Sequence, residues 1–179
     1  VAGDTCPMKS KVCENICYAM KGFIVLQRAK YEANYDATLT DTFVDDMVQR
    51  IRQETQKMRY PSFRFQVSGD IYSIDYAHKI KQIAQQLPDV HFWAYTRSWA
   101  SSAMLPALEE IRALPNFQLF ASIDESMPAP PTDWRVAYME SDDRNSGLVC
   151  PEQTGTKASC ADCHYCFMGS RGNVVFKIH

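Results

Sequence analysis

Short apolar runs recur at an even spacing along the middle of the chain. FRFQV, VHFWAY and FQLFASI begin at Phe63, Val90 and Phe117, so each starts 27 residues after the one before. Runs of this length, rich in aromatic and β-branched residues, are typical of strands. WRVAYM at 134–139 and NVVFKI at 173–178 have the same character. The pattern therefore predicts five strands.

The segments between the first three runs carry apolar residues at helical spacing. Each segment has a set on one helical face: Tyr76, Ile80, Ile83 and Leu87 in the first, and Met104, Leu108 and Ile111 in the second. Ser73 and Ser101 are suitable N-caps, and turns with Pro88 and Pro115 follow the helices. Strands that alternate with helices indicate βαβ units, parallel pairing and right-handed connections.

The first third of the chain has helical character. Residues 14–58 contain no proline, and Pro61 follows them. Thr40 is a candidate N-cap for a helix with an apolar stripe of Phe43, Val44, Met47, Val48 and Ile51. We therefore expect residues 14–58 to be helical.

These elements predict an α/β fold. A closed eight-stranded barrel needs about 200 residues or more, and this chain has 179, with its first strand only at Phe63. We expect an open or partial (β/α) barrel with parallel strands, a helical N-terminal part and Cys-rich ends. One domain over 1–179 would hold a cysteine motif and helices at 1–60, βα repeats at 61–140, and a cysteine-rich segment with the final strand at 141–179.

Composition narrows the class of protein. A hydrophobic fraction of 46% and an aromatic fraction of 12% are ordinary for a packed globule. The net charge is −2 and the chain has no run of lysine or arginine, which disfavours nucleic acid as a partner. No apolar run approaches the roughly 20 residues that span a bilayer, so we expect no membrane partner and a cytoplasmic location.

The seven cysteines lie in two short segments near the ends of the chain. Their positions are Cys6, Cys13 and Cys17 in the first segment, and Cys150, Cys160, Cys163 and Cys166 in the second. An odd number disfavours a complete disulfide framework, and clustering suits ligands that converge on one inorganic centre. All seven are therefore candidate metal ligands.

The second segment contains a C-x2-C-x2-C run. Such runs bind iron–sulfur clusters, although four thiolates also suit a structural zinc. Iron is favoured over zinc because Cys163 belongs to both of the overlapping C-x2-C pairs in the run, and because Pro151 follows Cys150. The first segment offers three thiolates, which would leave one iron of a [4Fe-4S] cluster open for another ligand. One cluster or two are both compatible with this pattern.

Polar residues follow three successive strands, at the end where ligands bind in parallel sheets. They are Ser68, Gly69 and Asp70, then Thr96 and Arg97, then Ser122, Asp124 and Glu125. Their recurrence indicates that they surround one cavity.

Two resemblances arise from these motifs. The three-cysteine opening that ends in Cys17-Tyr18-Ala19 resembles the cluster motif of radical S-adenosylmethionine enzymes. VSGDIYS, YTRSW, ASIDES and the later CPEQ segment with its cysteines resemble a family of small phage proteins called gene product eighty-eight. The resemblance implies an iron–sulfur protein on a shortened radical-enzyme-like scaffold. S-adenosylmethionine is then a possible cofactor, with Ser68, Gly69, Asp70, Thr96 and Arg97 as its binding residues.

The sequence thus predicts an iron–sulfur protein of phage type, in the host cytoplasm, that transfers electrons or senses redox state through a [4Fe-4S] cluster. A redox partner protein is possible. One alternative is a radical S-adenosylmethionine-like enzyme with an open N-terminal cluster. The other is a zinc-stabilised interaction module.

Overall fold

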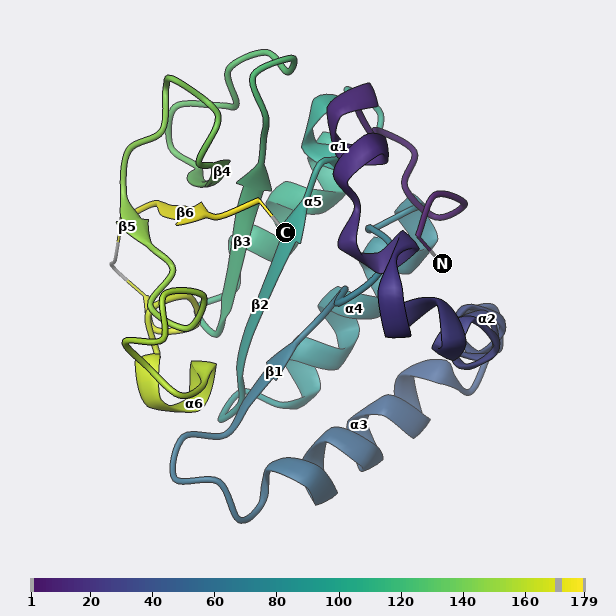
Figure 1. Cartoon of the computed structure of the whole chain (residues 1–179). Coiled ribbons are helices and arrows are strands. Elements are labelled where there is room, and N and C mark those ends of the chain that lie inside the picture. Colours follow the sequence, from purple (N-terminus) through teal and green to yellow (C-terminus); the bar gives the residue numbers. More distant parts are fainter. Residues whose placement is uncertain (1, 170–171, 179) are drawn as a thin grey trace.

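Within residues 2–169 and 172–178, which the computed structural model describes, the strands form one six-stranded sheet (Figure 1). The order across the sheet is β1 (Ser62–Arg64), β2 (His91–Thr96), β3 (Phe117–Ser122), β4 (Arg135–Met139), β6 (Val174–Phe176) and β5 (Leu148–Val149). Every pair of neighbours is parallel. The predicted α/β half-barrel is therefore confirmed, and so are its five predicted strands. The short strand β5 was not predicted.

The repeating apolar runs meet side by side in the sheet. Phe63 pairs with Phe92, and Phe92 pairs with Phe117. The rings of Phe92 and Phe117 are stacked with their centroids 5.9 Å apart. Helices α3 (Phe43–Thr55), α4 (Ile74–Gln86) and α5 (Leu105–Arg112) cover this face of the sheet. Removing these apolar side chains from water is the main favourable contribution to folding.

The predicted helical faces are the buried ones. Residues from all three helices are fully buried in the core, among them Ile51, Ile80, Ile83, Leu108 and Ile111. The Ser73 side chain caps α4 as predicted, since its Oγ accepts a hydrogen bond from the Tyr76 N–H at 3.1 Å. The prediction for Ser101 was wrong. The turn η3 (Ser98–Ala100) precedes it, and Met104 is the N-cap of α5.

The prediction that residues 14–58 are helical is confirmed, but the region is divided into several short helices. The structure has α1 (Lys11–Ile16), the 3-10 helices η1 (Tyr18–Met20) and η2 (Gly22–Gln27), then α2 (Arg28–Thr38) and α3. Cys17 leaves the helical region at ψ 111°, and Gly22 has a φ of +59° that favours glycine. Thr42, rather than Thr40, is the N-cap of α3, and the Thr40 hydroxyl donates to the Ala37 carbonyl instead.

The C-terminal segment covers the opposite face of the sheet. Figure 1 shows α6 (Cys160–Cys163) on the other side of the strands from α4 and α5, while β6 and β5 extend the sheet at one edge. A small second core gathers here, formed by Phe120, Ala137, Cys150 and Val174. The N-terminal segment lies across the end at which the strands finish (Figure 1). Across the described part of the chain, every helix is too short or too polar to span a bilayer.

Candidate functional site

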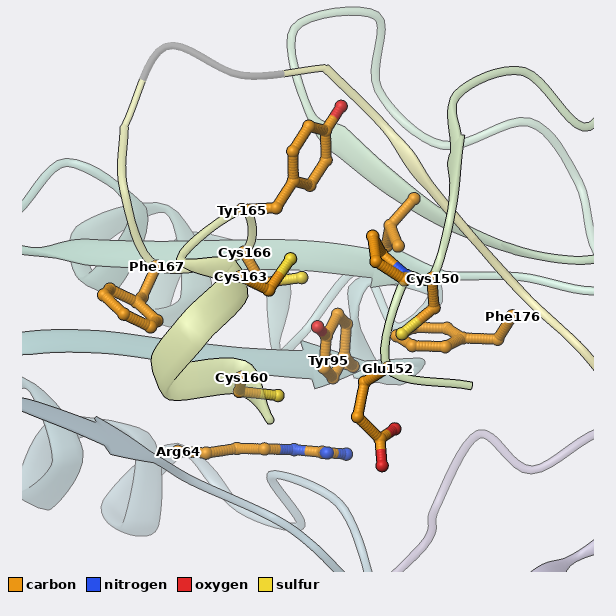
Figure 2. A pocket seen from close by; sticks show the side chains of 12 residues that line it. Arg64, Tyr95, Cys150, Glu152, Cys160, Cys163, Tyr165, Cys166, Phe167 and Phe176 are labelled. Atoms are coloured by element: carbon orange, nitrogen blue, oxygen red, sulfur yellow. The ribbon is translucent and has the colours of Figure 1, made fainter. Parts of the chain in front are cut away.

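The four C-terminal cysteines surround one small cavity of about 30 Å³ (Figure 2). Cys150 follows β5 and is fixed to β6, because its N–H donates to the Val175 carbonyl at 2.9 Å. Cys160 and Cys163 lie on α6. His164 ends that helix at a φ of 59°, and the chain then turns so that Cys166 also reaches the cavity. Strands and a short helix thus bring together residues that are 16 positions apart in the sequence.

Burial raises the pKa of two of these thiols. It raises the pKa of Cys160, against the nearby charge of Arg64. It raises the pKa of Cys166 to about 11, against a hydrogen bond from the Tyr95 hydroxyl and the charge of Arg135. A bound metal centre supplies positive charge and deprotonates such thiols. The donor set therefore fits a thiolate-ligated metal centre that releases protons as it forms.

The four thiols line one cavity but are not placed to bind a single metal ion. As placed, the described residues contain no group of three His, Cys, Asp or Glu side chains that could hold one metal ion. Their sulfur atoms nevertheless project into one space (Figure 2). A cluster takes one thiolate at each iron, so its ligands lie farther apart than those of a single ion.

The three N-terminal cysteines line a second, larger cavity of about 420 Å³. Cys13 lies on α1, Cys17 ends that helix, and Cys6 lies in the preceding turn. Burial raises the pKa of Cys6, and Asp70 adds to this effect. Burial also raises the pKa of Cys13, although the charge of Arg97 opposes it. The thiol forms of Cys6 and Cys13 are therefore favoured in the absence of a cation.

A buried ion pair anchors the loop that carries these three cysteines. Ser10 caps α1 by accepting from the Cys13 N–H at 2.9 Å, and its hydroxyl donates to Asp124 at 2.5 Å. The Arg97 guanidinium donates to the same carboxylate oxygen at 2.5 Å. Burial alone would raise the pKa of Asp124, but bonds from Ser10 and Ser126 and the charge of Arg97 hold it below its usual value.

Most of the predicted strand-end residues line the large cavity. They are Ser68, Gly69, Asp70, Arg97 and Ser122. Thr96 is fully buried behind them and Asp124 is held in the ion pair, so neither lines the cavity. Glu125 also lies outside the lining and accepts from the Ser141 hydroxyl at 3.3 Å.

The Asp70 carboxylate is engaged within the protein. It accepts from the Ile71 N–H at 2.6 Å, the Thr96 hydroxyl at 2.5 Å and the Arg97 N–H at 2.8 Å. Burial outweighs these three bonds and raises the pKa of Asp70 to about 6. The carboxylate thus ties the ends of β1 and β2 together at the cavity wall.

Three polar atoms at the large cavity are buried without a hydrogen-bond partner among the described residues: Arg64 Nε, Gln66 Oε1 and Ser68 Oγ. Buried polar groups are nearly always paired. These atoms are therefore suited to bind the polar groups of a ligand.

Arg64, Tyr95 and Phe176 line both cavities. Sequence reasoning missed all three. Side chains alternate between the two faces of a strand, so Arg64 and Tyr95 point away from the apolar face that carries Phe63 and Phe92. Polar residues on the second face of β1 and β2 could therefore have indicated a site there. Fold and site together define an α/β half-barrel protein whose cysteines surround two adjoining cavities.

Comparison with known proteins places this chain in a phage family. The sequence model of the family described as Gene product 88 matches residues 1–169. The chain therefore belongs to the gene product 88 family, as its motifs predicted. No solved structure matches the chain.

Two relatives carry the name Gene 88 protein. That of Mycobacterium phage L5 is 27% identical over 201 aligned positions, which cover 97% of this chain and 82% of the relative. That of Mycobacterium phage D29 is 30% identical over 131 positions, which cover 68% of this chain and 53% of the relative.

Proposed function

We propose that this chain is an iron–sulfur protein in which the C-terminal cysteines hold a [4Fe-4S] cluster. The observation that carries the proposal is the gathering of Cys150, Cys160, Cys163 and Cys166 around one cavity. Four thiolates are the usual ligand set of such a cluster, and the C-x2-C-x2-C run is typical of it. We favour a cluster over a single zinc ion because Cys163 belongs to both C-x2-C pairs of the run.

Electron transfer or redox sensing is the function that we assign to this cluster. Its pocket is walled by Tyr95, Phe167 and Phe176, and an apolar wall that limits solvent access tunes a cluster's potential. A cluster with four protein ligands has no open iron for a substrate, which favours electron exchange with a redox partner protein over catalysis at this site.

A second candidate function rests on the large cavity. Three thiolates there leave one iron of a cluster open, and about 420 Å³ of space lies beside them at the carboxyl ends of the strands. This arrangement supports a radical S-adenosylmethionine-like activity. In that case Ser68 and Gly69 would face the cofactor, while Asp70, Thr96 and Arg97 would hold the wall behind it.

Metal analysis of protein purified without oxygen tests both functions. The electron-transfer proposal predicts about four irons and four acid-labile sulfides per chain, and two clusters would give about eight of each. The double variant Cys160→Ala/Cys163→Ala should remove the C-terminal cluster, and Cys13→Ala/Cys17→Ala should remove the N-terminal one. Stoichiometric zinc without iron would overturn the proposal in favour of a zinc-stabilised interaction module.

A separate assay tests the second candidate. Dithionite-reduced protein is incubated with S-adenosylmethionine, and 5′-deoxyadenosine is quantified. Formation of this product that is lost in Cys13→Ala/Cys17→Ala but kept in Cys160→Ala/Cys163→Ala would support the radical activity. Iron-loaded protein that forms no product would refute it and leave the electron-transfer proposal intact.

A further inference from the structure

Three unpartnered polar atoms lie on one short segment that begins at the end of β1. In the described part of the chain, four buried side-chain polar atoms lack a hydrogen-bond partner, and three of them are Arg64 Nε, Gln66 Oε1 and Ser68 Oγ. All three residues line the large cavity of about 420 Å³. Because native proteins leave few buried polar groups unpaired, their concentration at one cavity indicates a site whose ligand supplies the missing partners.

Other contacts orient two of these side chains. Gln66 Nε2 donates to the Tyr76 hydroxyl at 3.0 Å, so Oε1 is the end of the amide that is left without a partner. The Arg64 guanidinium carbon lies 5.0 Å from the centroid of the Tyr95 ring, and Figure 2 shows both residues. The guanidinium is thus held against an aromatic ring while its Nε stays available to a ligand.

Arg64 also brings an unpaired positive charge to the cavity. None of the ion pairs among the described residues includes Arg64, although Glu152 lines the small cavity with it. Arg97, by contrast, is paired with Asp124 at 2.5 Å. Asp70 is the one carboxylate in the described lining of the large cavity, and three hydrogen bonds within the protein engage it. A carboxylate or phosphate group is the natural partner of a free guanidinium.

Much of the remaining lining is apolar or aromatic. These residues are Ile16, Tyr18, Tyr95, Tyr138, Met139 and Phe176. The Tyr18 hydroxyl donates to the Val67 carbonyl, which fixes the N-terminal wall of the cavity to the segment that carries the three polar atoms. Aromatic walls favour a flat apolar body, and a cavity of this volume is within the range that holds small organic molecules.

We propose that the large cavity binds a small organic anion with a flat apolar body. Arg64 Nε and Ser68 Oγ donate to its carboxylate or phosphate group, Gln66 Oε1 accepts from a donor elsewhere on the molecule, and the aromatic wall packs against the body. This inference goes beyond the proposed iron–sulfur function and does not depend on it, because none of the three binding groups is a cysteine.

Isothermal titration calorimetry on the full-length chain, purified without oxygen, tests the site with three probes: 2-naphthoate, 2-naphthyl phosphate and the neutral 2-naphthamide. Wild-type protein should bind at least one of the anions, and the amide at least tenfold more weakly. The tighter anion identifies the charged group that the site prefers. Arg64→Gln should weaken binding of that anion about tenfold and leave binding of the amide unchanged.

Two further variants guard against a merely structural effect. Ser68→Ala removes an unpartnered hydroxyl and should weaken binding of the anion about fivefold without loss of folding. Arg59→Gln is the matched control, because Arg59 is an exposed cation that lines neither cavity, and it should leave the affinity unchanged.

The site is overturned if neither anion binds, if the amide binds as tightly as the anions, or if Arg64→Gln keeps the wild-type affinity. Failure of this site and failure of the iron–sulfur function are distinguishable. Iron-loaded protein that binds neither anion overturns the site alone, whereas iron-free protein that binds an anion through Arg64 supports the site and refutes the iron–sulfur function.

Discussion

The hydroxyl of Ser10 donates a hydrogen bond of 2.5 Å to the buried carboxylate of Asp124, 114 residues later in the chain. This bond joins the N-cap of α1 to the end of β3. Because Ser10 lies between Cys6 and Cys13, the position of two candidate ligands depends on a residue of the sheet. The same carboxylate binds Arg97 at the end of β2.

Breaking this anchor should loosen the three-cysteine loop. Asp124→Ala leaves Arg97 buried without its partner, so we expect the free energy of unfolding to fall by about 3 kcal/mol. Ser10→Ala removes only the cap and one bond and should cost about 1 kcal/mol. Urea unfolding of metal-free protein measures both values. Ser10→Thr keeps the hydroxyl and serves as the control, and equal stability of all three variants with the wild type would refute the anchor.

The raised pKa of Asp70 predicts a pH-dependent stability. The folded-state pKa is about 6, against 3.8 for an ordinary aspartate, so between these values the folded protein retains a proton that the unfolded chain has lost. The contribution of Asp70 is therefore fully present below about pH 4 and is lost as the pH rises through 6. Over that window it amounts to about 3 kcal/mol.

Asp70→Asn isolates this contribution, because the amide does not titrate. The difference in free energy of unfolding between wild type and Asp70→Asn should shift in favour of the variant as the pH is raised from 4 to 7. Urea unfolding at several pH values measures it. A difference that stays constant with pH would show that Asp70 ionises normally in the folded protein.

Metal removal should expose the C-terminal thiols unequally. In the loaded protein, all four cysteines should resist alkylation by iodoacetamide. After chelation, Cys160 should react first because it is exposed, and Cys166 should lag because burial raises its pKa to about 11. Mass spectrometry of quenched time points follows each site. Equal protection before and after chelation would argue against a metal centre at these residues.

Truncation of a buried side chain in the core under the helices should lower the free energy of unfolding. Leu108 is fully buried between α5 and the sheet, so Leu108→Ala should lower the free energy of unfolding by about 3 kcal/mol. Leu39 is 57% exposed, and Leu39→Ala is the matched control with a change near zero. Thermal or urea denaturation compares the two. A similar loss in both variants would contradict the described packing.

The sequence predicted the sheet well because its strands are local features. Phe63, Val90 and Phe117 each open an apolar run, and parallel pairing follows from the helices between the runs. The ends of the helices within residues 14–58 were harder to predict, because composition does not show that Cys17 and Gly22 interrupt the helical region. The two-residue strand β5 has too few positions to form a pattern.

The candidate site was predicted in part. The cysteines and the residues around Ser68 are recognisable from type and spacing alone. The juxtaposition of Arg64 with Tyr95, and of Ser10 with Asp124, depends on long-range contacts that no single sequence reveals. For the same reason, the use of Asp70 as an internal hydrogen-bond acceptor could not be foreseen.

The position of β6 inside the sheet affects the order of assembly. Strand β5 pairs, among the described strands, with β6 alone, and Cys150 is bonded to Val175. During synthesis, β1 to β4 can therefore pair as they leave the ribosome, while Cys150 and its strand must wait for residues 174–176. The small cavity around Cys150, Cys160, Cys163 and Cys166 can therefore form only after β6 has been translated.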